Sequence, residues 1–309
     1  MSHSSPDALQ QRCQQIVASP ALSPEQKRHF LALEAENNLP YPALPEAARA
    51  ALDEGFICDM FEGHAPYKPR YVLPDYAKFL ANGSEWLELE GAKDLDDALS
   101  LLTILFHHVP SVTSMPVYLG QLDALLQPYV RILTKEEINS RIKRFWRYLD
   151  RTLPDAFMHA NIGPEDTPIT RAILRADAEL KQVAPNLTFI YDPAFTPDEL
   201  LLEVAKNICE CSKPHISNGP VNDKIFTKGH YGVVSCYNSL PLAGGGSTLV
   251  RLNLKAIAEH STSMEDFFSR ALPHYCQQQM AIIDARCDFL YQQSGFFENS
   301  FLVKEGLID

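Results

Sequence analysis

The chain has 309 residues, 46% of them hydrophobic, and a formal net charge of −12. This size is sufficient for one large core or two ordinary ones. The acidic balance argues against binding to a nucleic-acid backbone, because phosphate contacts require a basic surface. There is no run of about 18 or more apolar residues, and the polar N-terminus MSHSSPDALQQRC lacks a signal-peptide core. We therefore expect a cytoplasmic protein with no nucleic-acid or membrane partner.

Seven cysteines are scattered along the chain, at positions 13, 58, 209, 211, 236, 276 and 287. An odd number at irregular spacing does not indicate a disulfide framework, so we expect reduced thiols. Cys209 and Cys211 precede His215, but Cys-x-Cys is not a common zinc spacing and a complete site needs a fourth ligand. We therefore predict no bound metal.

Helical patterns dominate the first half of the chain. Two capping boxes, Ser23-Pro24-Glu25-Gln26 and Thr134-Lys135-Glu136-Glu137, predict helix starts. Between them, apolar residues at helical spacing behind Asp94 predict a buried helix over 94–107. We expect residues 1–90 to form a helical and proline-rich region that packs on a core built from 91–309.

The second half alternates between helical and extended patterns. Residues 165–183 predict a helix, 186–191 a strand, and the segment that begins at Thr196 a further helix. This alternation is typical of an α/β barrel or a doubly wound sheet, so the fold class is α/β. A long capped helix is expected over 264–295.

Cys236 lies in a setting that core packing alone does not easily explain. The apolar run Tyr231-Gly232-Val233-Val234 predicts a short buried strand, and the residues after the cysteine, Pro241 and Gly244 to Gly246 among them, are typical of turns. A second strand is expected over 248–253, with a helix from Leu254. The cysteine is thus placed on a loop between two strands, although an isolated cysteine is most often a small buried hydrophobe.

A polar pair near a turn is the second feature of interest. The segment 114–131 begins extended, turns at Gly120, and presents Gln121 and Asp123 just before a short apolar helix that ends at Pro128. Such a pair beside apolar walls can line a pocket, but polar residues at a helix start are usually caps. The spacing alone leaves both interpretations open.

The run from Pro185 through Ala258 resembles the core of the glycyl-radical enzymes, especially the anaerobic ribonucleotide reductases and, more distantly, pyruvate formate-lyase. The matching motifs are Pro185-Asn-Leu-Thr188, Thr196-Pro-Asp-Glu-Leu200, Pro214-His-Ile-Ser-Asn218, Cys236, Gly244 to Gly246 and Asn253-Leu254. Upstream, Leu119 to Asp123 with Pro128-Tyr129 resembles a further segment of the superfamily. Over almost its whole length the chain resembles the YjjI proteins, a family of the glycyl-radical type.

The resemblance implies both a fold and a reaction. The fold would be the first part of a ten-stranded α/β barrel with helical N-terminal decoration. Cys236 would be the thiyl carrier that takes a hydrogen atom from a small-molecule substrate under anaerobic conditions. The candidate substrate-binding residues are Gln121, Asp123, Asn218 and Asn253. The implied partner is an iron–sulfur activating enzyme that uses S-adenosylmethionine to install a glycyl radical, and members of the superfamily often form homodimers.

Two departures from the pattern limit what the resemblance implies. Tyr237 follows Cys236 where pyruvate formate-lyase has a second cysteine, which disfavours acyl-thioester transfer. The C-terminal R-V-x-G-Y-like loop that carries the glycyl radical is absent from residues 1–309. We therefore expect an N-terminal portion, with no cofactor bound in this chain, that is inactive alone.

Two other functions remain open. Cys236 could be a nucleophile paired with His215, His230 or His260, in which case iodoacetamide should label it selectively at neutral pH. Alternatively, the chain could be a non-catalytic binding or scaffold protein, in which case Cys236 should be packed in apolar core with no adjoining cavity.

Overall fold

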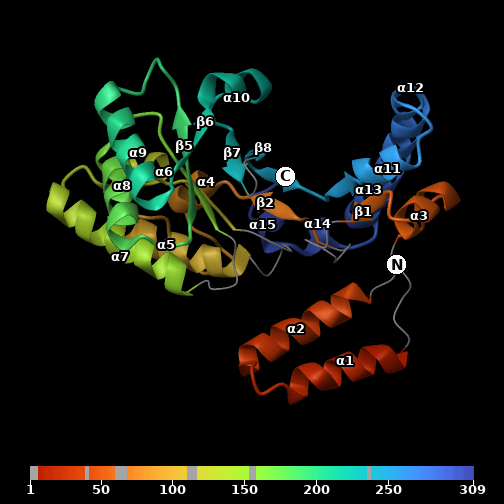
Figure 1. Ribbon diagram of the computed structural model, residues 1–309. Helices are drawn as coiled ribbons and strands as arrows, with labels where there is room; N and C mark the ends of the chain where they lie inside the picture. The colour runs from red at the N-terminus through yellow and green to blue at the C-terminus, as the bar shows by residue number, and fades with distance from the viewer. Residues whose placement is uncertain (1–5, 39–41, 60–67, 110–116, 153–157, 235–237) are drawn as a thin grey trace. The chain divides into compact units, whose positions relative to one another are not determined.

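The computed structural model describes every residue except 1–5, 39–41, 60–67, 110–116, 153–157 and 235–237 (Figure 1). The chain forms two compact units. Unit 1 comprises Met1–Arg70 and Ser247–Phe296, and unit 2 comprises Tyr71–Gly246 and Phe297–Asp309. The expected division at residue 90 coincides with neither junction. Within the described part of the chain, no helix is long and apolar enough to cross a membrane.

Unit 1 is mostly helical. Its elements are α1 (Pro6–Ala18), α2 (Pro24–Asn37), α3 (Glu46–Asp53), β1 (Ile57–Asp59), β10 (Val250–Leu252), α11 (Leu254–Glu259), α12 (Met264–Asp266), a π-helical turn (Phe267–Ala271) and α13 (Leu272–Gln292). The capping box of α2 is confirmed, because Ser23 Oγ accepts from Gln26 N and Gln26 Oε1 accepts from Ser23 N. β1 pairs with β10 in an antiparallel ladder that contributes Ile57 and Val250 to a small core.

The long helix expected over 264–295 is interrupted. The turn Phe267–Ala271 is π-helical and separates α12 from α13. Pro273 lies in the first turn of α13 and has no N–H to donate to the preceding turn, so a wider turn there is the physical reason for the interruption. The strand expected over 248–253 is shorter than predicted, Val250–Leu252.

Unit 2 contains the sheet on which the candidate site is built. Its elements are β2 (Tyr71–Leu73), α4 (Tyr76–Asn82), α5 (Leu95–His108), β3 (Tyr118–Gln121), α6 (Leu122–Leu126), a 3₁₀ turn (Gln127–Tyr129), α7 (Lys135–Thr152), β4 (His159–Ile162), α8 (Pro168–Leu180), β5 (Asn186–Tyr191), α9 (Asp198–Cys211), β6 (His215–Asn218), α10 (Gly219–Ile225), β7 (Tyr231–Val234), β8 (Asn238–Pro241), β9 (Gly244–Gly246) and α15 (Phe301–Lys304). The short helix α14 (Phe296–Asn299) contains the junction with unit 1.

Several of these elements follow from local sequence. Asp94 caps α5 by accepting from Asp97 N at 2.9 Å, which confirms the helix predicted over 94–107. Thr134 and Glu137 form the predicted capping box before α7. α8 begins three residues later than expected, because Thr167 is its cap and Pro168 occupies its first position.

Strands β3, β4, β5 and β6 form one parallel sheet in sequence order. Each strand is joined to the next through a helix: α7 before β4, α8 before β5 and α9 before β6. Such crossovers are almost always right-handed, so consecutive crossovers in one direction place all their helices on the same face. Figure 1 shows these helices together beside the sheet, in green. The sheet is therefore wound in one direction, as in a barrel, and is not doubly wound.

The two faces of this sheet differ in chemistry, because side chains alternate along each strand. The face that the helices cover is apolar, with Leu119, Ala160, Ile162, Leu187 and Phe189 all fully buried. The opposite face, which we call the polar face, carries Tyr118, His159, Asn161, Asn186, Thr188 and His215. The register places these side chains side by side, since His159 is opposite Asn186 and Thr188 is opposite His215.

Residues 238–246 differ from the expected turns. Asn238–Pro241 form β8, antiparallel to β7, and Gly244–Gly246 form β9, antiparallel to β2. The glycines serve close approach here, because a Cβ on Gly245 would lie 2.1 Å from Tyr71 O. Among the described residues there are one four-stranded parallel sheet and three two-stranded ladders. The α/β class is thus confirmed, whereas the ten-stranded barrel is not.

Candidate functional site

The site is best described from the hairpin that brackets the candidate cysteine. Cys236 itself lies outside the described residues. On either side of it in the sequence, Val234 of β7 and Asn238 of β8 are partners in one antiparallel ladder. The contacts that hold β7 and β8 therefore determine where the segment with Cys236 leaves the sheet and returns to it.

Asn161 of β4 holds β7 against the polar face. Its Oδ1 accepts from Val233 N at 2.8 Å, and its Nδ2 donates to Val233 O at 2.9 Å. The side chain is only 2% exposed. Because both peptide groups of Val233 are satisfied by one side-chain amide, Asn161 takes the position that a neighbouring strand would otherwise occupy.

Asn222 of α10 holds the second strand of the hairpin. Its Oδ1 accepts from Ser239 Oγ of β8 at 2.9 Å, and its Nδ2 donates to Ser217 Oγ of β6 at 3.0 Å. Each strand of the hairpin is thus linked to the parallel sheet through a buried asparagine. Both links are neutral.

The remaining polar face is also uncharged at neutral pH. Burial, together with the smaller effect of neighbouring His215, lowers the pKa of His159 to about 4. Burial and the charge of Lys213 lower the pKa of His215 as well. His159 Nε2 lies 3.1 Å from Asn186 Nδ2. The side chains of this face are therefore neutral hydrogen-bonding groups.

Gln121 lines a pocket at the carboxyl end of β3. The pocket has a volume of about 390 Å³, and its walls include Tyr118, Gly120, Leu125 and Leu242. Gln121 begins α6 without capping it, and its Nε2 donates to Gly163 O. The structure thus places Gln121 at a cavity, while Asp123 and Asn218 are not among the described walls.

Asp123 is a buried carboxyl that joins α6 to the end of β4. It accepts from Gly163 N at 2.6 Å, Thr170 Oγ1 at 2.8 Å and Ala124 N at 2.8 Å. Burial raises its pKa to about 6, although the three donors favour the charged form and oppose that shift. These contacts tie α6 to the end of β4 and to α8.

The two candidate asparagines are helix caps. Asn218 Oδ1 accepts from Val221 N at 3.2 Å and caps α10, and its residue is exposed. Asn253 Oδ1 accepts from Ala256 N at 3.2 Å, and its Nδ2 donates to Gly55 O at 3.0 Å. Asn253 belongs to unit 1, whereas the other three candidates belong to unit 2. Their roles in substrate binding remain predictions.

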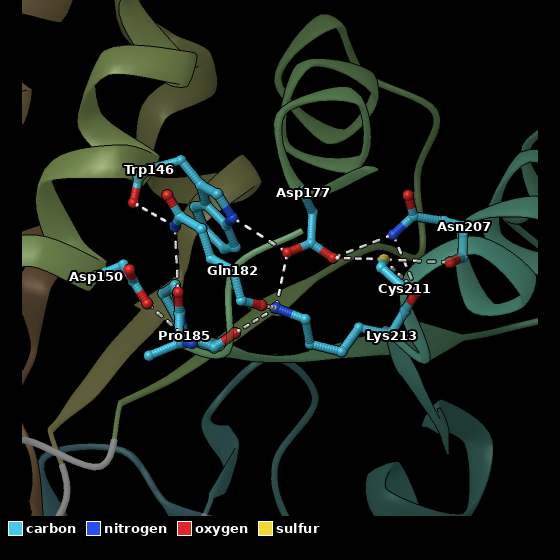
Figure 2. Close-up of polar contacts among 9 residues, drawn as sticks. Trp146, Asp150, Asp177, Gln182, Pro185, Asn207, Cys211 and Lys213 are labelled. Atoms are coloured by element: carbon cyan, nitrogen blue, oxygen red, sulfur yellow. Dashed lines mark hydrogen bonds and ion pairs between the residues drawn. The ribbon is translucent and has the colours of Figure 1, made fainter. Parts of the chain in front are cut away.

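A charged network lies at the opposite, amino end of the same sheet (Figure 2). Lys213 Nζ lies 2.8 Å from Asp177 Oδ1 and donates to the carbonyl oxygens of Gln182 and Pro185 at 2.9 and 3.1 Å. Asp177 is fully buried and also accepts from Trp146 Nε1, Asn207 Nδ2 and Cys211 Sγ. All three ammonium donors thus have partners, and the network links α7, α8 and α9 to the starts of β5 and β6.

Cys211 is therefore in a hydrogen bond with a carboxylate.

Among the described residues, no three histidine, cysteine, aspartate or glutamate side chains lie together in a way that could hold a metal ion. Cys209 is exposed on the other side of α9 from this network.

Solved structures define the class of fold. The anaerobic ribonucleotide reductase of Thermotoga maritima with citrate in its active site aligns at a TM-score of 0.65 and 14% identity, covering 97% of this chain and 59% of that one. The glycerol-bound B12-independent glycerol dehydratase of Clostridium butyricum aligns at 0.52 and 14%, covering 97% and 44%. The fold is thus similar to that of glycyl radical enzymes.

Sequence comparison gives the family. The model "Glycyl radical enzyme YjjI-like" matches residues 22–309, and the chain belongs to this family. It is 88% identical over 309 residues to the Escherichia coli (strain K12) protein YjjI, and 45% identical over 257 residues to an uncharacterized protein of Haemophilus influenzae. The chain spans 60% of the first protein and 49% of the second.

Sequence reasoning missed the residues that seat the hairpin, Asn161 and Asn222, and the histidine of the polar face, His159. One signal was available. His159 and Asn161 alternate with Ala160 and Ile162, which is the period of a strand with one polar and one apolar face.

Proposed function

We propose that the full-length protein is a glycyl radical enzyme in which Cys236 is the thiyl carrier. In the first step the Cys236 S–H bond breaks as the hydrogen atom passes to a glycyl radical carried elsewhere in the protein. In the second, the thiyl takes a hydrogen atom from a carbon of the substrate, so that the S–H bond forms again and a substrate radical results. Each step moves one hydrogen atom, and no charge is transferred.

The observation that carries the proposal is the seating of the hairpin. In the sequence, Cys236 falls between two strands that Asn161 and Asn222 hold against the polar face of the sheet. A reactive sulfur must be delivered by a rigid and water-shielded segment, since an exposed thiyl would react with whatever it met. Anchoring of the two flanking strands by buried amides supports such a role for the cysteine between them.

The same face supports a small polar substrate. The side chains around the hairpin are neutral hydrogen-bonding groups, and the two similar solved structures hold citrate and glycerol. We therefore infer a small hydroxylated molecule as the substrate. Activation would require an iron–sulfur enzyme that uses S-adenosylmethionine, and Gln121, Asp123, Asn218 and Asn253 remain the candidate binding residues.

The test needs no known substrate. The full-length protein is activated anaerobically, and the glycyl radical is followed by electron paramagnetic resonance in H₂O and in D₂O. Thiols exchange their hydrogen with solvent, so reversible transfer between Cys236 and the radical should replace the glycine α-hydrogen with deuterium. We expect the doublet to collapse to a singlet in D₂O for the wild type, and to persist in Cys236→Ala at equal radical yield.

Two results would reject the proposal. One is collapse at the same rate in Cys236→Ala, because another group would then exchange the hydrogen. The other is no radical in the wild type together with fast, selective alkylation of Cys236 by iodoacetamide at neutral pH. That combination would favour a nucleophilic cysteine, with His159 and His215 of the polar face as candidate bases to examine.

A further inference from the structure

We propose that Asn161, Gly232 and Tyr118 form a register lock, which fixes how far the β7–β8 hairpin extends along the polar face and so positions Cys236. Asn161 is a positioning residue in this scheme, and Gly232 and Tyr118 supply the steric part. The lock is a statement about geometry. Its meaning for catalysis rests on the proposed function of Cys236.

The amide of Asn161 recognises one residue of β7. Within a strand, the N–H and C=O of one residue point to the same side, and those of the next residue point to the other. A shift of one residue would therefore turn the peptide groups of Gly232 or Val234 away from Asn161. The two bonds to Val233, at 2.8 and 2.9 Å, would both be lost inside the protein.

A shift of two residues restores the peptide direction, and Gly232 excludes it. A Cβ at position 232 would lie 2.5 Å from Tyr118 Cζ, 2.7 Å from Tyr118 Oη and 2.9 Å from Leu73 Cδ2. A shift of two in either direction brings His230 or Val234 to this position, and both have a Cβ. Only glycine fits against the ring.

The ring itself is fixed. Tyr118 is 2% exposed, its hydroxyl donates to Asn161 Oδ1 at 3.3 Å, and its backbone carbonyl accepts from the hydroxyl of Tyr76. The polar and steric parts of the lock are thus one connected group. A substitution that moves the Tyr118 ring therefore also disturbs the hydrogen bonds of Asn161, and the reverse holds as well.

The register of β7 matters because even a small shift in it displaces the chain by a large distance. A strand advances about 3.3 Å per residue, so a two-residue shift moves the chain by about 7 Å. A misplacement of about 1 Å at a reacting group can slow a reaction by about 100-fold. The residue that fixes the register of β7 therefore has a large effect on any hydrogen transfer at Cys236, without touching the reacting atoms.

The experiment measures the rate of doublet collapse in D₂O in the activated full-length protein. We expect Asn161→Leu and Gly232→Ala to keep the radical yield and slow the collapse by about 100-fold. Asn207→Leu is the matched control. Asn207 is also a buried asparagine of unit 2, but it bonds Asp177 and Lys213 O at the amino end of the sheet. We expect this variant to lose stability and to keep the wild-type rate.

A second measurement tests the lock without the radical. Amide hydrogen exchange of the peptide that contains Val233 should be faster in Asn161→Leu than in wild type, and unchanged in Asn207→Leu. If Asn161→Leu does not fold, Asn161→Asp, which replaces the Nδ2 donor to Val233 O with a carboxyl oxygen, takes its place in both measurements.

The outcomes separate the two proposals. Wild-type rates of collapse and exchange in folded Asn161 and Gly232 variants would overturn the lock and leave the role of Cys236 intact. No difference between wild type and Cys236→Ala would reject the thiyl role, while faster exchange at Val233 in Asn161→Leu would still support the lock.

Discussion

Asp177 and Asp123 are buried carboxyl groups at opposite ends of the parallel sheet of unit 2, and their hydrogen-bond partners differ in charge. Asp177, at the amino end, faces the ammonium of Lys213 at 2.8 Å. Asp123, at the carboxyl end, has three neutral donors. Neutral donors do not offset the full cost of burying a charge, and the pKa of Asp123 is accordingly raised to about 6.

The difference shows how the sheet divides its polar groups. At the amino end, the charged pair Lys213–Asp177 links helices to the starts of strands, and every donor of the Lys213 ammonium has a partner. Neutral amides are used where the hairpin with Cys236 is held. A buried charge requires a partner of its own, whereas an amide can anchor a backbone and leave the surroundings uncharged.

The largest effect is expected from breaking the charged end. Lys213→Met leaves the Asp177 carboxylate buried without its cation, and we expect a loss of about 3 to 5 kcal/mol in the free energy of unfolding. Urea unfolding followed by circular dichroism measures it. Lys143→Met, at the exposed pair with Glu179, is the control and should change little. A small effect of Lys213→Met would mean that the neutral donors of Asp177 are sufficient to stabilise its buried carboxylate.

The next effect concerns the pH dependence of Asp123. Its pKa in the folded protein, about 6, lies above the ordinary value of 3.8. Between these values the folded state holds a proton that the unfolded state has lost, so the stability contributed by this group is full below pH 4 and is lost as pH rises to 6. The difference corresponds to on the order of 3 kcal/mol.

Asp123→Asn should remove this dependence. The free energy of unfolding of wild type minus variant, measured from pH 4 to pH 7, is expected to fall as pH rises. A difference that is constant over this range would show that Asp123 keeps an ordinary pKa, and the contrast with Asp177 would then disappear.

The smallest effect is on thiol reactivity at the charged end. Burial and the neighbouring Asp177 raise the pKa of Cys211 to about 11. Cys209, two residues earlier in α9, is exposed. At pH 7.5 we expect iodoacetamide to label Cys209 well before Cys211, as read by peptide mass spectrometry. Equal rates would mean that the network around Asp177 opens readily.

Local signals in the sequence were sufficient for some elements and not for others. The helix behind Asp94 and the strand 231–234 were predicted because a cap and an apolar run act within a few residues. β4 was missed because it has four residues, two of them polar. β8 and β9 were missed because Asn238, Pro241 and Gly244 to Gly246 are turn residues, which become strands here only through pairing with β7 and β2.

The candidate site shows the same limit. Gln121 was predicted beside a turn and does line a pocket. The contacts of Asp123 with Gly163 and Thr170 depend on residues 40 and 47 positions away. Asn161 was not predicted at all, because its partner Val233 is 72 residues further along the chain. Sequence patterns reveal side chains that bond to residues a few positions away. A side chain that bonds to the backbone of a distant residue produces no such pattern.

The discontinuity of unit 1 has a consequence for synthesis. β1 pairs with β10, so Ile57 cannot form its strand pairing until Leu252 has been synthesised. At about 5 to 20 residues per second, the ribosome needs on the order of 10 to 40 seconds to make the chain between them. The parallel sheet has no such delay, because its strands follow one another and each crossover can dock as it emerges. The parallel sheet should therefore be the first to protect its backbone, while the edge of β1 is open to chaperones and to other nascent chains.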